Sequence, residues 1–205
     1  MKKYIIIFLI FPLWAFAQKM VSKEIREVKK FQESLNAEYL DPKTTPLRGD
    51  HFKHFKGHPF FPFNTKYRVV AKITKAEDPQ PFEIPTSSGK TKTYREYGKA
   101  TFELDGKTYR LTLYQSLDLI RQKKYKNYLF LPFRDATNGK ETYGGGRYMD
   151  LTISKEDTMI LDFNKSYQPY CAYNAHDYNC PVVPEENRLP VEIRAGVMYD
   201  DIYHN

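Results

Sequence analysis

Cysteine is scarce in this chain, which contains only Cys171 and Cys180. A two-thiolate metal site is one interpretation of the pair, but no histidine or cysteine at zinc-ligand spacing accompanies it, and only His176 lies between the two. In an oxidising compartment a disulfide is favoured, and in so short a loop it would contribute about 2–3 kcal/mol to stability. We therefore predict a Cys171–Cys180 disulfide.

Long apolar runs are absent from the sequence except at its N-terminus. Residues 1–17 begin with two lysines after the first methionine, continue with an apolar run over residues 5–14, and end in the small-x-small sequence Ala-Phe-Ala. This order is typical of a secretory signal peptide, and the apolar run is short for a membrane span. We predict cleavage near Ala17, with an uncleaved N-terminal anchor as the alternative. The mature protein would be exported (periplasmic or secreted) and soluble, with no membrane span.

Neither sign of charge is in large excess. Lys and Arg number 32 against 25 Asp and Glu, and removal of residues 1–17 with their two lysines leaves a net charge of +5. The basic residues are scattered among acidic ones, as on an ordinary solvated surface. The sequence therefore predicts no nucleic-acid partner.

The 188 residues after the predicted cleavage site are enough for one domain with a core of its own. They begin with a predicted amphipathic helix over residues 22–39, for which Ser22 is a suitable N-cap and Asp41-Pro42 a stop signal. Apolar residues recur at steps of three and four, and we expect this face to pack on the main body: Ile25, Val28, Phe31 and Leu35.

Beyond the helix, short segments with β-strand patterns follow one another. Residues 99–104 and 107–114 alternate apolar and polar side chains around Asp105-Gly106, a two-residue hairpin turn. Five more strands are predicted over residues 67–73, 128–133, 147–153, 158–163 and 191–194, with a short helix over 116–126 and loops over 78–92 and 167–190. The sequence predicts a mostly β fold, a single antiparallel barrel or sandwich-like domain over residues 18–205 with its β body at 64–205.

Glycine is also scarce, yet three of the ten glycines stand together, as Gly144, Gly145 and Gly146 between Tyr143 and Arg147. A backbone without Cβ atoms can turn its N–H groups inward to hold an anion or a carbonyl oxygen, or it can bend at the corner of a sheet. The phosphate-loop pattern is absent, because no Gly-Lys-Ser/Thr and no helix follows. On spacing alone, a binding site and a bend are both open.

We predict that this loop binds a small polar or anionic molecule. Arg134 and Arg147 would supply charge-assisted hydrogen bonds, and the glycines backbone donors. Tyr143 and Tyr148 would form a stacking wall. The complete predicted set of ligand-binding residues is Arg134, Asp135, Thr137, Glu141, Tyr143, Gly144, Gly145, Gly146, Arg147, Tyr148, Asp162 and Asn164.

An extracytoplasmic, hydrolase-like enzyme is the alternative, with Glu141 or Asp162 as general base. No Gly-x-Ser-x-Gly is present and the cysteines are expected to be oxidised, so no nucleophile stands out. A structural envelope protein, with the loop as a folding device, is a third possibility. No pattern predicts a cofactor, and a histidine cluster lacks the spacing of a known metal-ligand set, so no metal is predicted: His51, His54 and His58.

Three ordered blocks of sequence make the chain similar to an uncharacterised bacterial and archaeal family, a domain of unknown function of roughly this length. The blocks are FLPFRDATNGKETYGGGRYMDL (130–151), LDFNKSYQPYCAY (161–173) and CPVVPEENRLPVEIRAG (180–196). The resemblance implies no activity, ligand or cofactor, but it adds weight to a site at the matching positions. These are Pro132, Phe133, Arg134, Asp135, Thr137, Gly139, Glu141, Thr142, Tyr143, Gly146, Arg147, Tyr148, Asp162, Phe163, Asn164, Tyr170, Cys171, Cys180, Pro181, Asn187 and Leu189.

Overall fold

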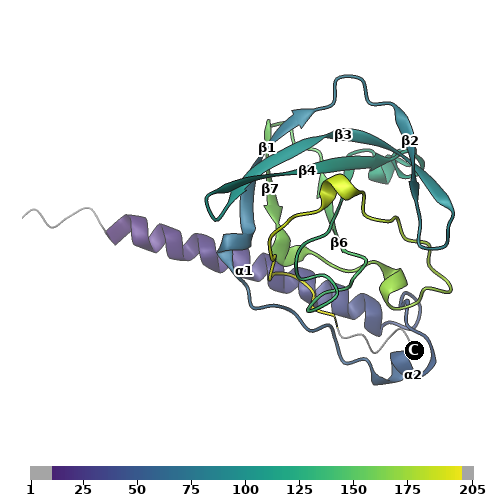
Figure 1. The fold of residues 1–205 in the computed structure, drawn as a ribbon. Helices are drawn as coiled ribbons and strands as arrows, with labels where there is room; N and C mark the ends of the chain where they lie inside the picture. The colour runs from purple at the N-terminus through teal and green to yellow at the C-terminus, as the bar shows by residue number, and fades with distance from the viewer. Residues whose placement is uncertain (1–10, 200–205) are drawn as a thin grey trace, which may run out of the picture.

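The computed structural model describes residues 11–199, with side chains from Ser22 onward (Figure 1). Its first element is the long helix α1 (Phe11–Leu40). Residues 1–10 of the predicted signal peptide lie outside the described residues, and residues 11–17 belong to α1. Ser22 is therefore inside the helix and is not its N-cap, whereas the predicted stop at Asp41-Pro42 is confirmed by the last helical residue, Leu40.

The predicted mostly β fold is confirmed. Seven antiparallel strands form one sheet in the order β6-β5-β4-β3-β1-β7, and β2 pairs with β3 beside this path. The sheet curls into half of a barrel around a core of apolar side chains (Figure 1). The elements are β1 (Arg68–Lys75), β2 (Pro81–Pro85), β3 (Thr91–Leu104), β4 (Lys107–Ser116), β5 (Tyr128–Phe133), β6 (Arg147–Thr152), β7 (Thr158–Asp162), and the short helices α2 (Gly49–His54) and α3 (Leu117–Ile120).

The longest strand, β3, organises the sheet because it pairs with three neighbours. Its predicted hairpin with β4 is confirmed, and Asp105 and Gly106 both have positive φ in the turn. The register shifts between Glu96 and Gly98, and this bulge separates the part of β3 that pairs with β2 from the part that pairs with β1. A Cβ at Gly98 would collide with the backbone oxygen of Thr74, so glycine permits the close approach of β1 at the bulge.

Two segments differ from the predicted secondary structure. Residues 81–85, in the predicted loop 78–92, form the strand β2, whose prolines stand at its two ends, where a missing N–H is tolerated. The predicted strand over residues 191–194 is wrong. Its alternation reflects real burial, since Ile193 and Ala195 are fully buried, but their backbone oxygens accept hydrogen bonds from the side chain of Arg147. The predicted helix over residues 116–126 shortens to α3 and a single 3-10 turn.

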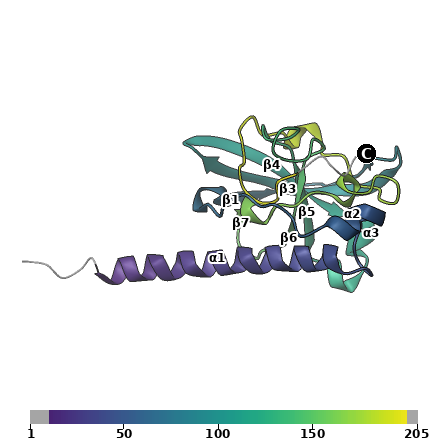
Figure 2. The ribbon, with the colours of Figure 1, turned by 90° about the horizontal axis from the view of Figure 1, so that it is seen from below.

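Helix α1 lies along one side of the body as a straight rod, and its first turns extend beyond the sheet (Figure 2). The predicted apolar face does pack on the body, with Val28 and Leu35 buried, although Ile25 at its start is exposed. A half-buried ion pair between Glu24 and Arg68, 3.0 Å apart, adds to this contact. The helix is thus held from its middle to its C-terminal end.

His58 is buried beside the C-terminal end of α1, in a cluster of aromatic rings. Its ring meets Tyr39 edge-on with the centroids 4.3 Å apart, and its Nδ1 lies 3.2 Å from the hydroxyl of Tyr173. Burial lowers the pKa of His58 from 6.5 to about 4. The packing between α1 and the body therefore requires a neutral imidazole.

His58 makes the folded protein sensitive to mild acid. The unfolded chain takes up a proton at His58 near pH 6.5 but the folded chain only near pH 4, so the stabilisation is complete above pH 6.5 and is lost as the pH falls through this window. We expect the free energy of unfolding to be about 2 kcal/mol lower at pH 5 than at pH 7 in urea titrations. The variant His58→Asn should lose most of this difference, and His54→Asn, at an exposed histidine, should keep it. An unchanged pH dependence in His58→Asn would contradict this account.

Candidate functional site

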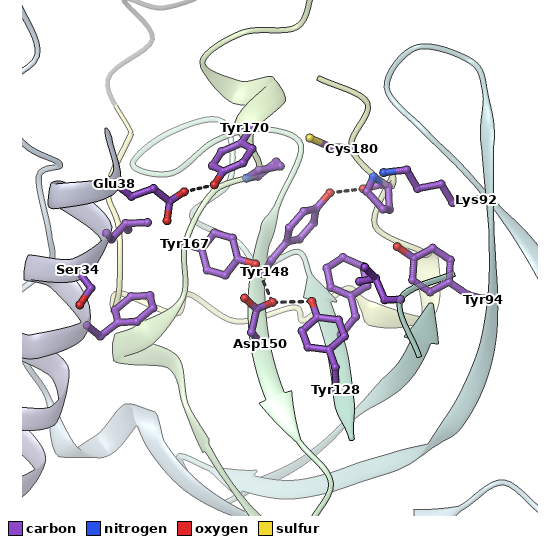
Figure 3. Close-up of a pocket in the computed structure, with 16 residues that line it drawn as sticks. Ser34, Glu38, Lys92, Tyr94, Tyr128, Tyr148, Asp150, Tyr167, Tyr170 and Cys180 are labelled. Carbon is purple, nitrogen blue, oxygen red and sulfur yellow. Dashed lines mark hydrogen bonds between the residues drawn. The ribbon is translucent and has the colours of Figure 1, made fainter. Parts of the chain in front are cut away.

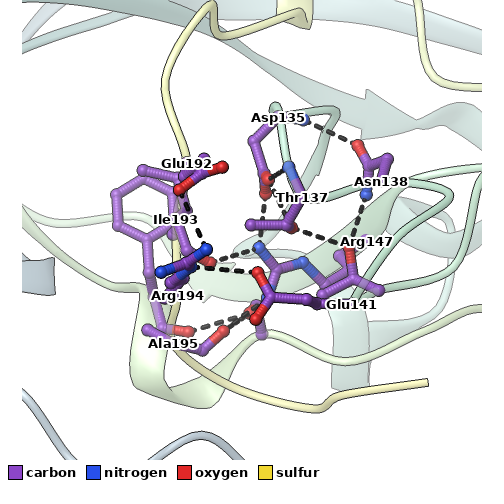
Figure 4. Close-up of polar contacts among 12 residues, drawn as sticks. Asp135, Thr137, Asn138, Glu141, Arg147, Glu192, Ile193, Arg194 and Ala195 are labelled. Atoms are coloured by element: carbon purple, nitrogen blue, oxygen red, sulfur yellow. Dashed lines mark hydrogen bonds and ion pairs between the residues drawn. The ribbon is translucent and has the colours of Figure 1, made fainter.

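The guanidinium of Arg147, at the start of β6, is fully buried (Figure 4). It forms an ion pair with the buried carboxylate of Asp135 and donates hydrogen bonds to the backbone oxygens of Ile193 and Ala195. It also lies over the ring of Phe133, with 5.1 Å between the guanidinium carbon and the ring centroid. These contacts join the loop after β5 to the C-terminal segment, so Arg147 acts as a tie within the protein.

The loop after β5 is also held by its own polar side chains. Asp135 accepts a hydrogen bond from the backbone N–H of Thr137 at 2.7 Å, and the hydroxyls of Thr137 and Thr142 lie 2.8 Å apart. The side chain of Asn138 accepts from the N–H of Asp135 at 2.7 Å and donates to the hydroxyl of Thr142 at 2.8 Å (Figure 4). Such an internal network keeps the loop in one conformation.

The three consecutive glycines form the tight turn between this loop and β6. Gly146 has a φ of +98°, its N–H donates to the oxygen of Tyr143 at 3.1 Å, and a Cβ there would lie 2.7 Å from the oxygen of Phe133. A Cβ at Gly145 would collide with the ring of Tyr143. Glycine is therefore needed at Gly146 for its conformation and at Gly145 and Gly146 for close approach. Of the two interpretations of the glycines, a binding loop or a bend, this geometry corresponds to the bend.

Of three other predicted site residues, Asp162 and Asn164 are hydrogen-bonded to each other, whereas Glu141 is engaged elsewhere. Glu141 pairs at the surface with Arg194, 2.9 Å away. Asn164 exchanges two hydrogen bonds of 3.0 Å with the backbone of Asn64 and so fixes the chain that leads into β1. Asp162 accepts hydrogen bonds from Asn164, while its Oδ2 is buried without a hydrogen bond in the described part of the chain. Asp162 lines a cavity of about 350 Å³ between β6, β7 and α1.

The backbone of Arg134 is hydrogen-bonded to Asn187, a fully buried residue that forms a second polar network. Proline has no N–H, so Pro132 in β5 cannot donate to a neighbouring strand. The side chain of Asn187 donates to the oxygens of Pro132 and Thr112, at 2.7 and 2.9 Å, and accepts from the N–H of Thr112 at 2.7 Å. The N–H of Arg134 donates to the oxygen of Asn187 at 2.9 Å. One side chain thus bridges β4 and β5 beyond their ladder pair, Tyr114 and Phe130.

The two cysteines are free thiols, so the predicted disulfide is not formed in this structure. They are nevertheless neighbours, because the backbone N–H of Cys171 donates to the Sγ of Cys180 at 3.2 Å. A hydrogen bond from the thiol of Cys180 lowers the pKa of Cys171 to about 7. The sulfurs interact through hydrogen bonds where a covalent bond was predicted.

A cavity of about 480 Å³ lies between α1 and the sheet (Figure 3). This volume is in the range of cavities that hold small organic molecules. Its walls come from α1, β3, α3, β5, β6 and the segment after β7, and seven of the residues that line it are aromatic: Phe31, Tyr94, Tyr128, Phe130, Tyr148, Tyr167 and Tyr170. Of the predicted ligand-binding residues, Tyr148 is the one that lines this cavity.

The carboxylate of Asp150, on β6, stands among these rings. The hydroxyls of Tyr128 and Tyr167 both donate to its Oδ1, at 2.7 and 2.8 Å (Figure 3). Within residues 22–199, whose side chains are described, no hydrogen bond engages Oδ2. Asp150 is exposed to the open cavity, yet protein atoms surround it closely, and this partial desolvation raises its pKa although the two hydroxyls lower it.

A second carboxylate reaches the cavity from α1. Glu38 accepts a hydrogen bond from the hydroxyl of Tyr170, and its pKa is raised by burial and, to a lesser extent, by the negative charge of Asp150. Lys92, the basic side chain among the lining residues, is exposed and donates to the backbone oxygen of Asn179 at 2.9 Å. The cavity therefore combines aromatic walls with two carboxylates that repel each other.

Sequence reasoning found Tyr148 but missed the carboxylates Asp150 and Glu38. A signal for Asp150 was present, because alternation along β6 places it on the same face as Tyr148. No comparable signal existed for Glu38, which lies on a helix more than a hundred positions earlier in the chain. Only the packing of α1 against the sheet brings the two together.

Within residues 11–199, no helix has the length and apolar character to cross a membrane. Likewise, no three side chains of His, Cys, Asp or Glu among those residues gather in a way that could hold a metal ion.

Residues 53–198 match the family model described as a protein of unknown function, DUF1684. The chain belongs to this family. The solution NMR structure of an uncharacterized protein of Haloarcula marismortui is similar to the chain, with a TM-score of 0.68 and 30% identity over 89% of this chain and 97% of that chain. None of the curated proteins matches. The predicted resemblance to a domain of unknown function is confirmed. The matched residues include the strands that line the cavity, whereas α1 lies before the matched region.

We expect Arg147→Met to lower the free energy of unfolding by about 3–5 kcal/mol, because it leaves the carboxylate of Asp135 buried without a counter-charge. Arg194→Met is the matched control. It breaks the exposed pair with Glu141 and should cost less than about 1 kcal/mol. Urea denaturation of both variants at pH 7 measures the difference. Similar small losses in the two variants would argue against Arg147 as a structural tie.

Proposed function

We propose that this DUF1684 protein binds a small organic molecule in the cavity between α1 and the sheet. The observation that carries the proposal is the composition of the 480 Å³ cavity, in which aromatic walls surround a few polar groups. Apolar walls provide contact area, and sparse polar groups set orientation, which is the usual composition of small-molecule sites.

The proposal retains the binding module predicted from the sequence but assigns it a different contact surface. The loop from Arg134 to Tyr148 supports the cavity through its last residue, since Tyr148 and Asp150 project from the strand that Arg147 anchors. An anionic ligand is disfavoured in this cavity, because the carboxylates of Asp150 and Glu38 would repel it.

A hydrolase-like enzyme is the second candidate. The raised pKa values of Asp150 and Glu38 favour these residues as proton donors or acceptors over Glu141, which is paired with Arg194, or Asp162, which lines the smaller cavity. Turnover of a chromogenic ester or glycoside by the wild type that is lost in Asp150→Asn would favour the enzyme.

Binding in the cavity is tested by filling it. Ser34 is an exposed residue of α1 that lines the cavity, so Ser34→Trp should block the space without disturbing the core (Figure 3). Glu33→Trp, at the adjacent exposed position, is the control. In a thermal-shift screen of metabolites, we expect compounds that stabilise the wild type and Glu33→Trp but not Ser34→Trp. If no compound shows this selectivity, the proposal fails.

We also propose that the protein is exported with cleavage after Ala17. Support comes from the pattern of residues 1–17 and from the packing of α1, whose contacts with the body include the Glu24–Arg68 ion pair and the buried residues Val28 and Leu35, all of which remain in the mature chain. When the complete chain is expressed in a bacterium, we expect the mass of the periplasmic product to correspond to an N-terminus at Gln18. Ala17→Lys should retain residues 1–17. An uncleaved wild-type chain would contradict the proposal.

A further inference from the structure

The orientation of Asp150 leaves one of its oxygens available to a ligand. Both tyrosine hydroxyls donate to Oδ1, and together they fix the carboxylate plane. Oδ2 has no hydrogen bond within the described part of the chain. Glu38 is held in the same way, since its hydrogen bond from Tyr170 engages Oε1 alone among the described residues. The cavity thus offers two negatively charged acceptors that are already positioned.

Among the described residues, neither carboxylate forms an ion pair. Lys92, the basic residue that lines the cavity, is exposed, and its amino group donates to the backbone oxygen of Asn179. The charges of Asp150 and Glu38 interact unfavourably with each other across the cavity. A positively charged guest would be attracted to both carboxylates and would relieve their repulsion, and screening by water is reduced in this partly enclosed space.

The aromatic walls suit the same kind of guest. The ring of Tyr148 meets Phe130 at an interplanar angle of 76° with the centroids 4.7 Å apart, and it meets Tyr167 at 88° and 6.1 Å. Rings at right angles to one another form a corner in which more than one π face is within reach of a single group. The negative faces of such rings attract alkylammonium ions.

We infer that the ligand is an organic cation, an ammonium group with small apolar substituents, whose charge lies near Oδ2 of Asp150 and whose substituents contact the tyrosine rings. This inference rests on the proposed function, because it concerns the same cavity. An organic cation is the class of ligand that suits both the two carboxylates and the aromatic corner.

The experiment compares cationic, neutral and anionic ligands on the full chain by isothermal titration calorimetry, with one pair of equal shape. The probes are choline, its neutral carbon isostere 3,3-dimethylbutan-1-ol, benzyltrimethylammonium and benzoate. We expect both cations to bind at least about tenfold more tightly than the neutral isostere, and benzoate not to bind.

The variant Asp150→Asn keeps an oxygen that can accept from Tyr128 and Tyr167, so the fold should be retained. It should weaken binding of the cations about tenfold and leave the isostere unaffected. Asp157→Asn, at an exposed residue before β7, should bind like the wild type. Asp150→Glu should recover part of the loss because it restores the charge.

Other binding results would contradict either the cation inference or the proposed function. Equal binding of choline and its isostere, or preferential binding of benzoate, overturns the cation inference while binding in the cavity stands. The inference is also overturned if neither cation binds and the compounds sensitive to Ser34→Trp are neutral or anionic. If no compound is sensitive to Ser34→Trp, the proposed function itself fails.

Discussion

The sheet of this protein curls but does not close, and this constraint decides where a ligand can enter. Among the described strands, β6 and β7 end the sheet at opposite edges and do not pair with each other. The open side has to be covered, and α1 covers it with its apolar face (Figure 2). A rod on a curved surface leaves space at the contact. Both cavities described above lie along this line, and Phe31 and Asp150 contribute to each of them.

Polar side chains replace secondary structure in the last third of the chain. After β7 the backbone forms 3-10 turns and irregular segments, whose peptide groups still require hydrogen-bond partners when they are buried. The guanidinium of Arg147 binds two of the carbonyl groups, the amide of Asn187 joins two strands, and Asn164 binds the backbone of Asn64. The dense polar pattern in the sequence was interpreted as a surface for a ligand. In the structure, much of it satisfies the hydrogen bonds of a buried irregular backbone.

The predictability of this fold follows the range of the interactions that produce it. Helix periodicity, strand alternation and the Asp105-Gly106 turn are local, and each identified its element. The strand predicted over residues 191–194 failed because the partner of its backbone is a side chain from β6, which no local pattern reveals. The site follows the same rule. Tyr148 and Asp150 alternate along one strand and were within reach of the sequence, whereas the contribution of Glu38 depends on how α1 docks.

Helix α1 contributes one wall of the cavity and the sheet contributes the other, so two separate parts of the chain would contact a ligand. It contains no glycine or proline between residues 13 and 40 and would be about 45 Å long at the rise of an ideal helix, so it behaves as one stiff piece. Its side chains toward the cavity, such as Ser34 and Glu38, take part in no β-ladder, while Tyr148 and Asp150 lie on a strand with a fixed register. The positions of the residues on the sheet wall are therefore fixed by strand pairing, whereas those on the helix wall are not. The selectivity of the cavity can be altered from the helix side while the sheet remains unchanged.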